Sequence, residues 1–126
     1  MRLLLSVCLS AMLAGCGSPG PMKSATTPEL SLALLTLALD AWKGGASQVE
    51  LSQRNPPVYF VDDAYRRGAK LTSYTIEDTG KPVGTGISYV VTLQLQEAGA
   101  APAAKKVAFR VVTSPNNSIA REDGMP

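Results

Sequence analysis

The apolar residues in the first half of the chain recur at helical spacing. Intervals of three and four residues place several side chains on one face, namely Leu30, Leu34, Leu35, Leu37, Ala38, Leu39, Ala41 and Trp42. Thr27-Pro28-Glu29 is typical of a helix start, and Gly44-Gly45 is typical of a helix end. The pattern therefore predicts a long helix over Pro28–Lys43. Its apolar face is so broad that another part of the fold must cover it.

From Leu71 onward the period changes from helical to two. Clean alternation over 71–76, 85–97 and 105–113 predicts three strands that are each buried on one side, and 118–122 offers a fourth. The predicted inward residues are Ile87, Tyr89, Val91, Leu93, Leu95, Val107, Phe109 and Val111. The segments Thr79–Pro82, Ala98–Ala104 and Ser114–Asn117 predict the turns and loops between these strands.

Shorter elements are expected between the helix and the strands. Ser47–Glu50 matches a capping box and predicts a short helix to about Gln53, which Asn55-Pro56-Pro57 ends. Val58–Val61 is a short β-prone run, and Asp62-Asp63 is suited to cap one further helical turn.

This order of elements predicts an α+β fold. A long N-terminal helix is expected to pack on a curved antiparallel sheet of three to four strands, around one core. The layout over Thr27–Asp123 resembles the cystatin-like and nuclear transport factor 2-like roll, in which a curved sheet wraps a leading helix. Members of that roll include isomerases, ligand binders and scaffold modules, so the resemblance does not by itself give a function.

The first sixteen residues have the pattern of a processing signal. Arg2 supplies a short basic region, Leu3–Leu13 is apolar, and the segment ends in Leu13-Ala14-Gly15-Cys16. The apolar run of about 11 residues is too short to span a membrane, which takes about 20. The final tetrapeptide resembles the lipobox of bacterial lipoproteins. That resemblance implies that signal peptidase recognises Leu13, Ala14 and Gly15, and that the thiol of Cys16 receives a diacylglyceryl group; the alternative is a secretory leader with an incidental cysteine.

The lipobox divides the chain into three parts: residues 1–15 are a cleaved signal peptide, 16–26 are the lipidated cysteine and a flexible tether, and 27–126 are a single domain. The acyl chains would make the membrane the chain's first partner. In the lipoproteins it resembles, an Asp directly after the lipidated cysteine favours retention in the inner membrane. Here that position is Gly17, so the resemblance implies an outer-membrane protein facing the periplasm. The chain also resembles small lipoproteins, which share Ala41-Trp42-Lys43-Gly44 and a closing Arg121-Glu122-Asp123.

Composition narrows the possible chemistry. The chain has 12 Lys and Arg against 10 Asp and Glu, no His and two Cys, of which Cys8 leaves with the leader. A net charge of +2 gives no basic footprint for nucleic acid. Without His or a free thiol, nucleophilic catalysis finds no support, and the acidic residues lack metal-ligand spacing. We therefore expect neither a metal site nor a cofactor, and no catalytic residues.

Four aromatic residues remain as possible contacts for a ligand or partner: Trp42, Tyr59, Tyr65 and Tyr74. Their simpler interpretation is packing in the core. The expected function is a non-enzymatic binding or scaffold module of the cell envelope, whose partner is an envelope protein. One alternative is a carrier of small apolar molecules with a pocket between the helix and the sheet. A less favoured one is an isomerase-type enzyme that uses a carboxylate of Asp62, Asp63 or Glu77 beside a tyrosine.

Overall fold

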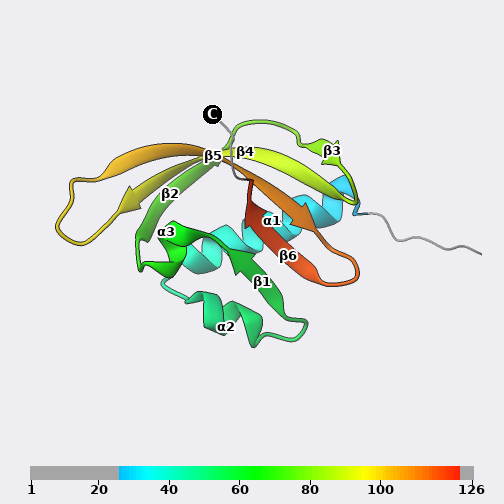
Figure 1. Cartoon of the computed structure of the whole chain (residues 1–126), viewed down its shortest axis with the longest axis horizontal. Coiled ribbons are helices and arrows are strands. Elements are labelled where there is room, and N and C mark those ends of the chain that lie inside the picture. The colour runs from blue at the N-terminus through cyan, green and yellow to red at the C-terminus, as the bar shows by residue number, and fades with distance from the viewer. Residues whose placement is uncertain (1–25, 123–126) are drawn as a thin grey trace, which may run out of the picture.

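The computed structural model describes residues 26–122, which form three helices and one six-stranded sheet (Figure 1). The helices are α1 (Pro28–Lys43), α2 (Gln48–Ser52) and α3 (Asp63–Arg66). The strands are β1 (Val58–Val61), β2 (Lys70–Ile76), β3 (Lys81–Val83), β4 (Gly86–Gln96), β5 (Ala103–Val112) and β6 (Asn117–Arg121). The predicted α+β class is confirmed. The predicted leader and lipidation site, with nearly all of the tether, lie outside the described residues.

The sheet has the strand order β1-β6-β5-β4-β2, and β3 pairs with β4 beyond the end of β2. Its central strands β4 and β5 are antiparallel, with Tyr89 opposite Phe109. β1 instead pairs with β6 in parallel, with Phe60 opposite Ile119. The prediction of three to four antiparallel strands is therefore wrong in strand number and in the direction of one pair.

Two short segments explain this difference. Val58–Val61 has only four residues, and so short a run carries no information on which strand it joins or in which direction. Lys81 and Pro82 were expected in a turn but belong to β3, where Pro82 lies opposite Ile87 at the edge of the sheet. An edge position tolerates proline because its missing N–H is not needed by a second neighbour.

The sheet curls around α1, which lies in its hollow (Figure 1). Thr27 caps the helix by accepting a hydrogen bond from the backbone N–H of Leu30 at 3.2 Å, and Pro28 occupies its first turn. Gly45, at φ 97°, provides the left-handed residue that turns the chain away after Lys43. The buried residues of α1 are Ser31, Leu34, Leu35, Ala38, Leu39 and Trp42.

The curl of the sheet does not cover the whole apolar face predicted for this helix. Leu30 and Leu37, expected inside, are 57% and 42% exposed, and Leu32 is 43% exposed. The covered face is centred on Leu35 and Ala38, which lose all contact with solvent. Leu30 and Leu37 lie about a third of a turn away from that centre, beyond what one curled sheet covers fully.

The core between α1 and the sheet is filled by side chains. All the inward residues predicted for β4 and β5 are buried, with Leu51, Phe60 and Ile119 beside them. Inside it, the hydroxyl groups of Ser31 and Tyr89 form a buried hydrogen bond of 2.6 Å. Space for a ligand therefore lies at the ends of α1 and outside this core.

Candidate functional site

Three aromatic rings pack together at the C-terminal end of α1. The rings of Trp42 and Tyr65 are stacked, with centroids 4.4 Å apart and planes 9° from parallel. Phe60 meets both rings edge-on, at 5.9 Å from Trp42 and 5.2 Å from Tyr65. These are the arrangements that the quadrupoles of aromatic rings favour. We call these three residues the aromatic cluster.

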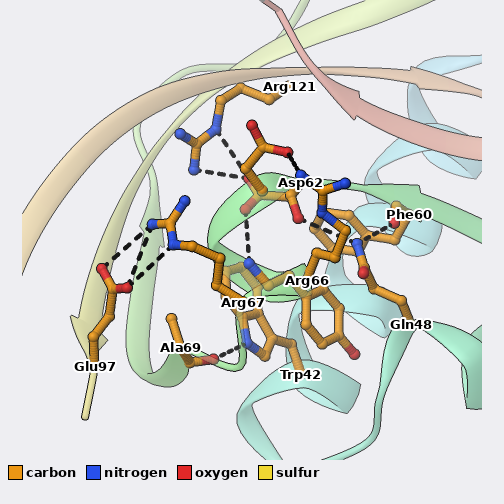
Figure 2. Close-up of polar contacts among 11 residues, drawn as sticks. Trp42, Gln48, Phe60, Asp62, Arg66, Arg67, Ala69, Glu97 and Arg121 are labelled. Atoms are coloured by element: carbon orange, nitrogen blue, oxygen red, sulfur yellow. Dashed lines mark hydrogen bonds and ion pairs between the residues drawn. The ribbon is translucent and has the colours of Figure 1, made fainter.

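Polar atoms of the aromatic cluster are satisfied by backbone carbonyl groups. The Nε1–H of Trp42 donates to the carbonyl oxygen of Ala69 at 2.8 Å, as Figure 2 shows. The hydroxyl of Tyr65 donates to the carbonyl oxygen of Ala46. The first bond joins the end of α1 to the residue before β2, and the second joins α3 to the loop that follows α1. They allow large aromatic side chains to be buried without an unpaired polar atom.

Next to the aromatic cluster lies a buried ion pair (Figure 2). The side chain of Asp62 has no exposed surface, and its Oδ2 accepts a hydrogen bond from Nε of Arg121 at 2.9 Å. The Nη2 atom of Arg121 lies 2.8 Å from the same oxygen in an ion pair, but it forms no hydrogen bond with the described residues. The Oδ1 of Asp62 accepts from the backbone N–H of Tyr65 at 3.0 Å and so caps α3. The pair therefore joins the residue after β1 to β6.

Gln48 completes this network from α2. Its Nε2 donates to the carbonyl oxygens of Phe60 at 2.7 Å and of Asp62 at 3.3 Å (Figure 2). β1 lies at the edge of the sheet, where its outward carbonyl groups have no strand to pair with. The amide of Gln48 therefore occupies the edge of β1 in the place of another strand.

An open groove with a volume of about 650 Å³ lies beside the aromatic cluster. We call it the Trp42 groove; it is lined by Trp42, Lys43, Gly45, Tyr65, Lys70 and Thr72, among others. Lys43 and Lys70 are exposed on its rim, and neither forms an ion pair with another residue of 26–122. The groove combines an apolar wall with two free cations, a combination that suits a ligand with a flat apolar body and an anionic group.

Two of the tyrosines remain protonated well above neutral pH. Burial, with the nearby charge of Glu50, raises the pKa of Tyr65 to about 12. Burial and a hydrogen bond to Asp40 raise the pKa of Tyr74 to about 12 as well. The hydroxyl of Tyr74 donates to Oδ1 of Asp40 at 2.7 Å. At neutral pH both hydroxyls are hydrogen-bond donors already in use.

The four aromatic residues selected from the sequence do not form one site. Trp42 and Tyr65 come together and line the Trp42 groove, although both are mainly buried. Tyr59 is exposed on β1, and Tyr74 is half-buried on β2 beside α1. Of the four, only Trp42 and Tyr65 therefore line a common groove.

The three candidate carboxylates are also separated by the fold. Asp62 is held by Arg121 within the core, whereas Asp63 pairs with Arg66 in an exposed contact of 2.8 Å. Glu77 is exposed and accepts a hydrogen bond from the hydroxyl of Thr92. Arg121 was missed as a partner of Asp62 because only the β1–β6 pairing brings the two together. Gln48 was missed because its contacts depend on the packing of α2 beside β1, which no sequence spacing indicates.

Among residues 26–122, no three acidic, cysteine or histidine side chains are placed to hold a metal ion. Within the same residues, no helix has the length and apolarity to cross a membrane. Comparison of the chain with protein families, with curated proteins and with solved structures found no match.

Proposed function

We propose that this protein is a membrane-anchored lipoprotein of the cell envelope, and that its domain binds a partner without catalysing a reaction. The anchor is supported by Leu13-Ala14-Gly15-Cys16, with its position directly after an apolar run. Gly17 supports an outer-membrane location with the domain in the periplasm. The domain itself supports the architecture of a cystatin-like or nuclear transport factor 2-like roll, since its curled sheet encloses a helix.

Our choice of binding over catalysis rests on the contacts that the carboxylate of Asp62 already makes within the domain. An isomerase-type base needs a carboxylate that faces a ligand, with a tyrosine donor nearby. Asp62 is instead the buried carboxylate that caps α3 and pairs with Arg121, and the Tyr65 hydroxyl donates to Ala46. These contacts support a structural role for Asp62.

A small-molecule carrier is the second candidate function, and the Trp42 groove favours it. Its volume of about 650 Å³ lies in the range of ligand sites, which is roughly 300–1,000 Å³. Lys43 and Lys70 favour a carboxylate-bearing apolar ligand, such as a fatty or aromatic acid. The ligand would lie at the end of α1, since side chains fill the space between the helix and the sheet.

Lipid labelling tests the anchor. Cells that express the full chain are grown with a labelled fatty acid, and the protein is then purified and counted. We expect label in the parent protein and in the Cys8→Ser control, and complete loss in Cys16→Ser. Label that persists in Cys16→Ser contradicts the proposal, because the remaining cysteine lies in the predicted leader.

The single tryptophan of the chain tests the carrier function. Phenylbutyrate that enters the Trp42 groove is expected to change the emission of Trp42, with a dissociation constant that rises several-fold in Lys70→Gln. Lys81→Gln is the matched control, since Lys81 lies on β3 and does not line the groove. If phenylbutyrate leaves the emission of Trp42 unchanged, or if its dissociation constant is the same in Lys70→Gln and Lys81→Gln, the proposed binding of anionic ligands in this groove is wrong.

A further inference from the structure

The exposed side of α1 between Leu30 and Leu37 presents leucines to solvent. Leu30, Leu32, Ala33 and Leu37 are exposed there, and we call these four residues the leucine face. Between Pro28 and Leu39, Glu29 is the only charged residue. On a helix with 100° per residue the leucine face spans about 160° of the arc that the sheet leaves open, and Glu29 projects within that arc. An apolar face of this kind on a folded domain marks a contact surface.

A shallow groove continues the leucine face toward the sheet. It has a volume of about 540 Å³ and lies between α1 and the segment after β2, lined by Pro28, Leu32, Thr36, Ile76 and Tyr89, with Glu29 and Asp78 at its polar side. The contact surface therefore includes a hollow beside Leu32. Carbon chains that lie against the leucine face have room to enter it.

The course of the chain places the leucine face next to the predicted lipid anchor. Thr26 is buried, and its hydroxyl oxygen accepts from the backbone N–H of Thr113 at 3.0 Å, which fixes where the domain's chain begins. That point is the N-terminal end of α1, so the segment toward Cys16 leaves the domain beside Leu30. The helix end that carries the leucine face is thus the end attached to the anchor.

The distance to the anchor is short. Eleven residues, 17–27, separate Cys16 from Pro28. Fully extended they reach at most about 40 Å, and as a random chain they span about 18 Å on average. A link of this length holds the leucine face near the bilayer at an effective concentration of millimolar order. Contacts too weak to bind membranes by themselves are then populated.

We infer that the leucine face of α1 rests on the acyl chains of the bilayer surface and fixes the orientation of the anchored domain. This inference rests on the lipid anchor proposed above. Exposed leucines enter the boundary between headgroups and acyl chains, while Glu29 remains among the headgroups. The Trp42 groove, at the other end of α1, then lies farther from the lipid and open to the periplasm.

The test measures contact with lipid at defined residues of the full lipidated protein. Cysteines are introduced by Ala33→Cys within the leucine face and, as a matched reporter, by Val61→Cys on β1, where the valine is 64% exposed. Each is labelled with a fluorophore after the protein is reconstituted in vesicles of phosphatidylethanolamine and phosphatidylglycerol. Brominated lipids quench only fluorophores that enter the bilayer. We expect quenching at position 33 to be at least threefold stronger than at position 61.

Serine variants decide whether the leucines cause this contact. The double change Leu30→Ser and Leu37→Ser is expected to reduce quenching at position 33 at least threefold. The control is Val49→Ser with Val61→Ser, which removes exposed valines from α2 and β1. It is expected to leave quenching at position 33 unchanged.

The outcomes separate the two proposals. Equal quenching at positions 33 and 61, or quenching that the leucine changes do not alter, overturns the docking while the anchor stands. A fluorophore at position 33 that is shielded from an aqueous quencher but not quenched by brominated lipid indicates a protein partner on the leucine face, and also overturns it. Mass spectrometry that finds Cys16 unmodified overturns the anchor, and the docking with it.

Discussion

The two ends of α1 differ in how completely the fold uses them. At the C-terminal end, Trp42 is stacked on Tyr65 and bonded to Ala69, and the buried Asp62–Arg121 pair lies next to this cluster. At the N-terminal end, the leucine face has no cover within the described residues. The first end is explained by stability alone. The second is explained by stability only in part, because half-exposed leucines stabilise the fold less than buried ones.

This difference indicates where substitutions act on the fold and where they act on contacts with other molecules. A fully buried large side chain contributes roughly 1.5–3 kcal/mol through the apolar surface it removes from water, and a cavity left by its removal costs more. An exposed side chain contributes little to stability. The predictions below measure the free energy of unfolding of the purified protein, from the largest expected effect to the smallest.

Trp42→Ala is expected to destabilise the protein most, by about 4 kcal/mol. The change leaves a cavity beside Tyr65 and Phe60 and deprives the carbonyl group of Ala69 of its buried donor. Denaturation followed by circular dichroism measures it. Trp42→Phe, which keeps most of the ring volume, should lose less than half as much. Equal losses in the two variants would show that packing around Trp42 is unimportant.

Arg121→Met is expected to cost about 3 kcal/mol, because it leaves the carboxylate of Asp62 buried without a counter-charge. Arg66→Met is the matched control: Arg66 pairs with Asp63 at 2.8 Å, and both side chains are 72% exposed. Exposed pairs contribute about 0–1 kcal/mol. Urea denaturation of both variants should therefore separate them clearly, and similar losses would contradict the importance we assign to burial.

How far the sequence predicts this molecule depends on the range of the interactions. The inward residues of β4 were predictable, because alternation is a local pattern that one buried sheet face imposes. The parallel pairing of β1 with β6 was not predictable, because the four residues of β1 pair with a strand that is far from them in the sequence. The partnership of Asp62 with Arg121 depends on that pairing and was missed with it.

The leucine face shows a different limit. Helical spacing identified Leu30, Leu34 and Leu37 as one apolar face, and only Leu34 is buried. Periodicity reports which residues share a side of the helix but not how much of that side the sheet can cover. At the other end of α1, the sequence offered Trp42 and Tyr65 either as contacts for a ligand or as core residues, but no spacing indicated that their rings stack on each other.

Tyr65→Phe is expected to cost about 1 kcal/mol near neutral pH, through loss of the hydrogen bond to Ala46. The change should also alter how the free energy of unfolding depends on pH above 10. The pKa of Tyr65 is about 12 in the folded protein against 10.0 as its ordinary value. The stabilisation linked to its proton is therefore full below pH 10 and is lost as the pH rises from about 10 to 12.

Stability measured across that interval should fall less steeply in Tyr65→Phe than in the parent protein. Tyr59→Phe is the control, because Tyr59 is exposed on β1. Tyr74, whose pKa is also raised to about 12, supplies the dependence that remains. If the parent and Tyr65→Phe lose stability in parallel between pH 10 and 12, the proton of Tyr65 is not coupled to folding.

Leu37→Ser is expected to change stability least, by at most about 0.5 kcal/mol, since surface substitutions away from caps and buried networks rarely exceed this. Leu34→Ser, one helical turn away on the buried side, is the matched change and should cost several times more. Thermal unfolding of the detached protein in detergent-free buffer distinguishes them. A large loss in Leu37→Ser would place the leucine inside the fold and remove the reason for seeking an external surface that covers it. A negligible loss leaves contact with an external surface as the property for which leucine at this position matters, and it makes the serine variants of the leucine face clean probes of the proposed contact with lipid.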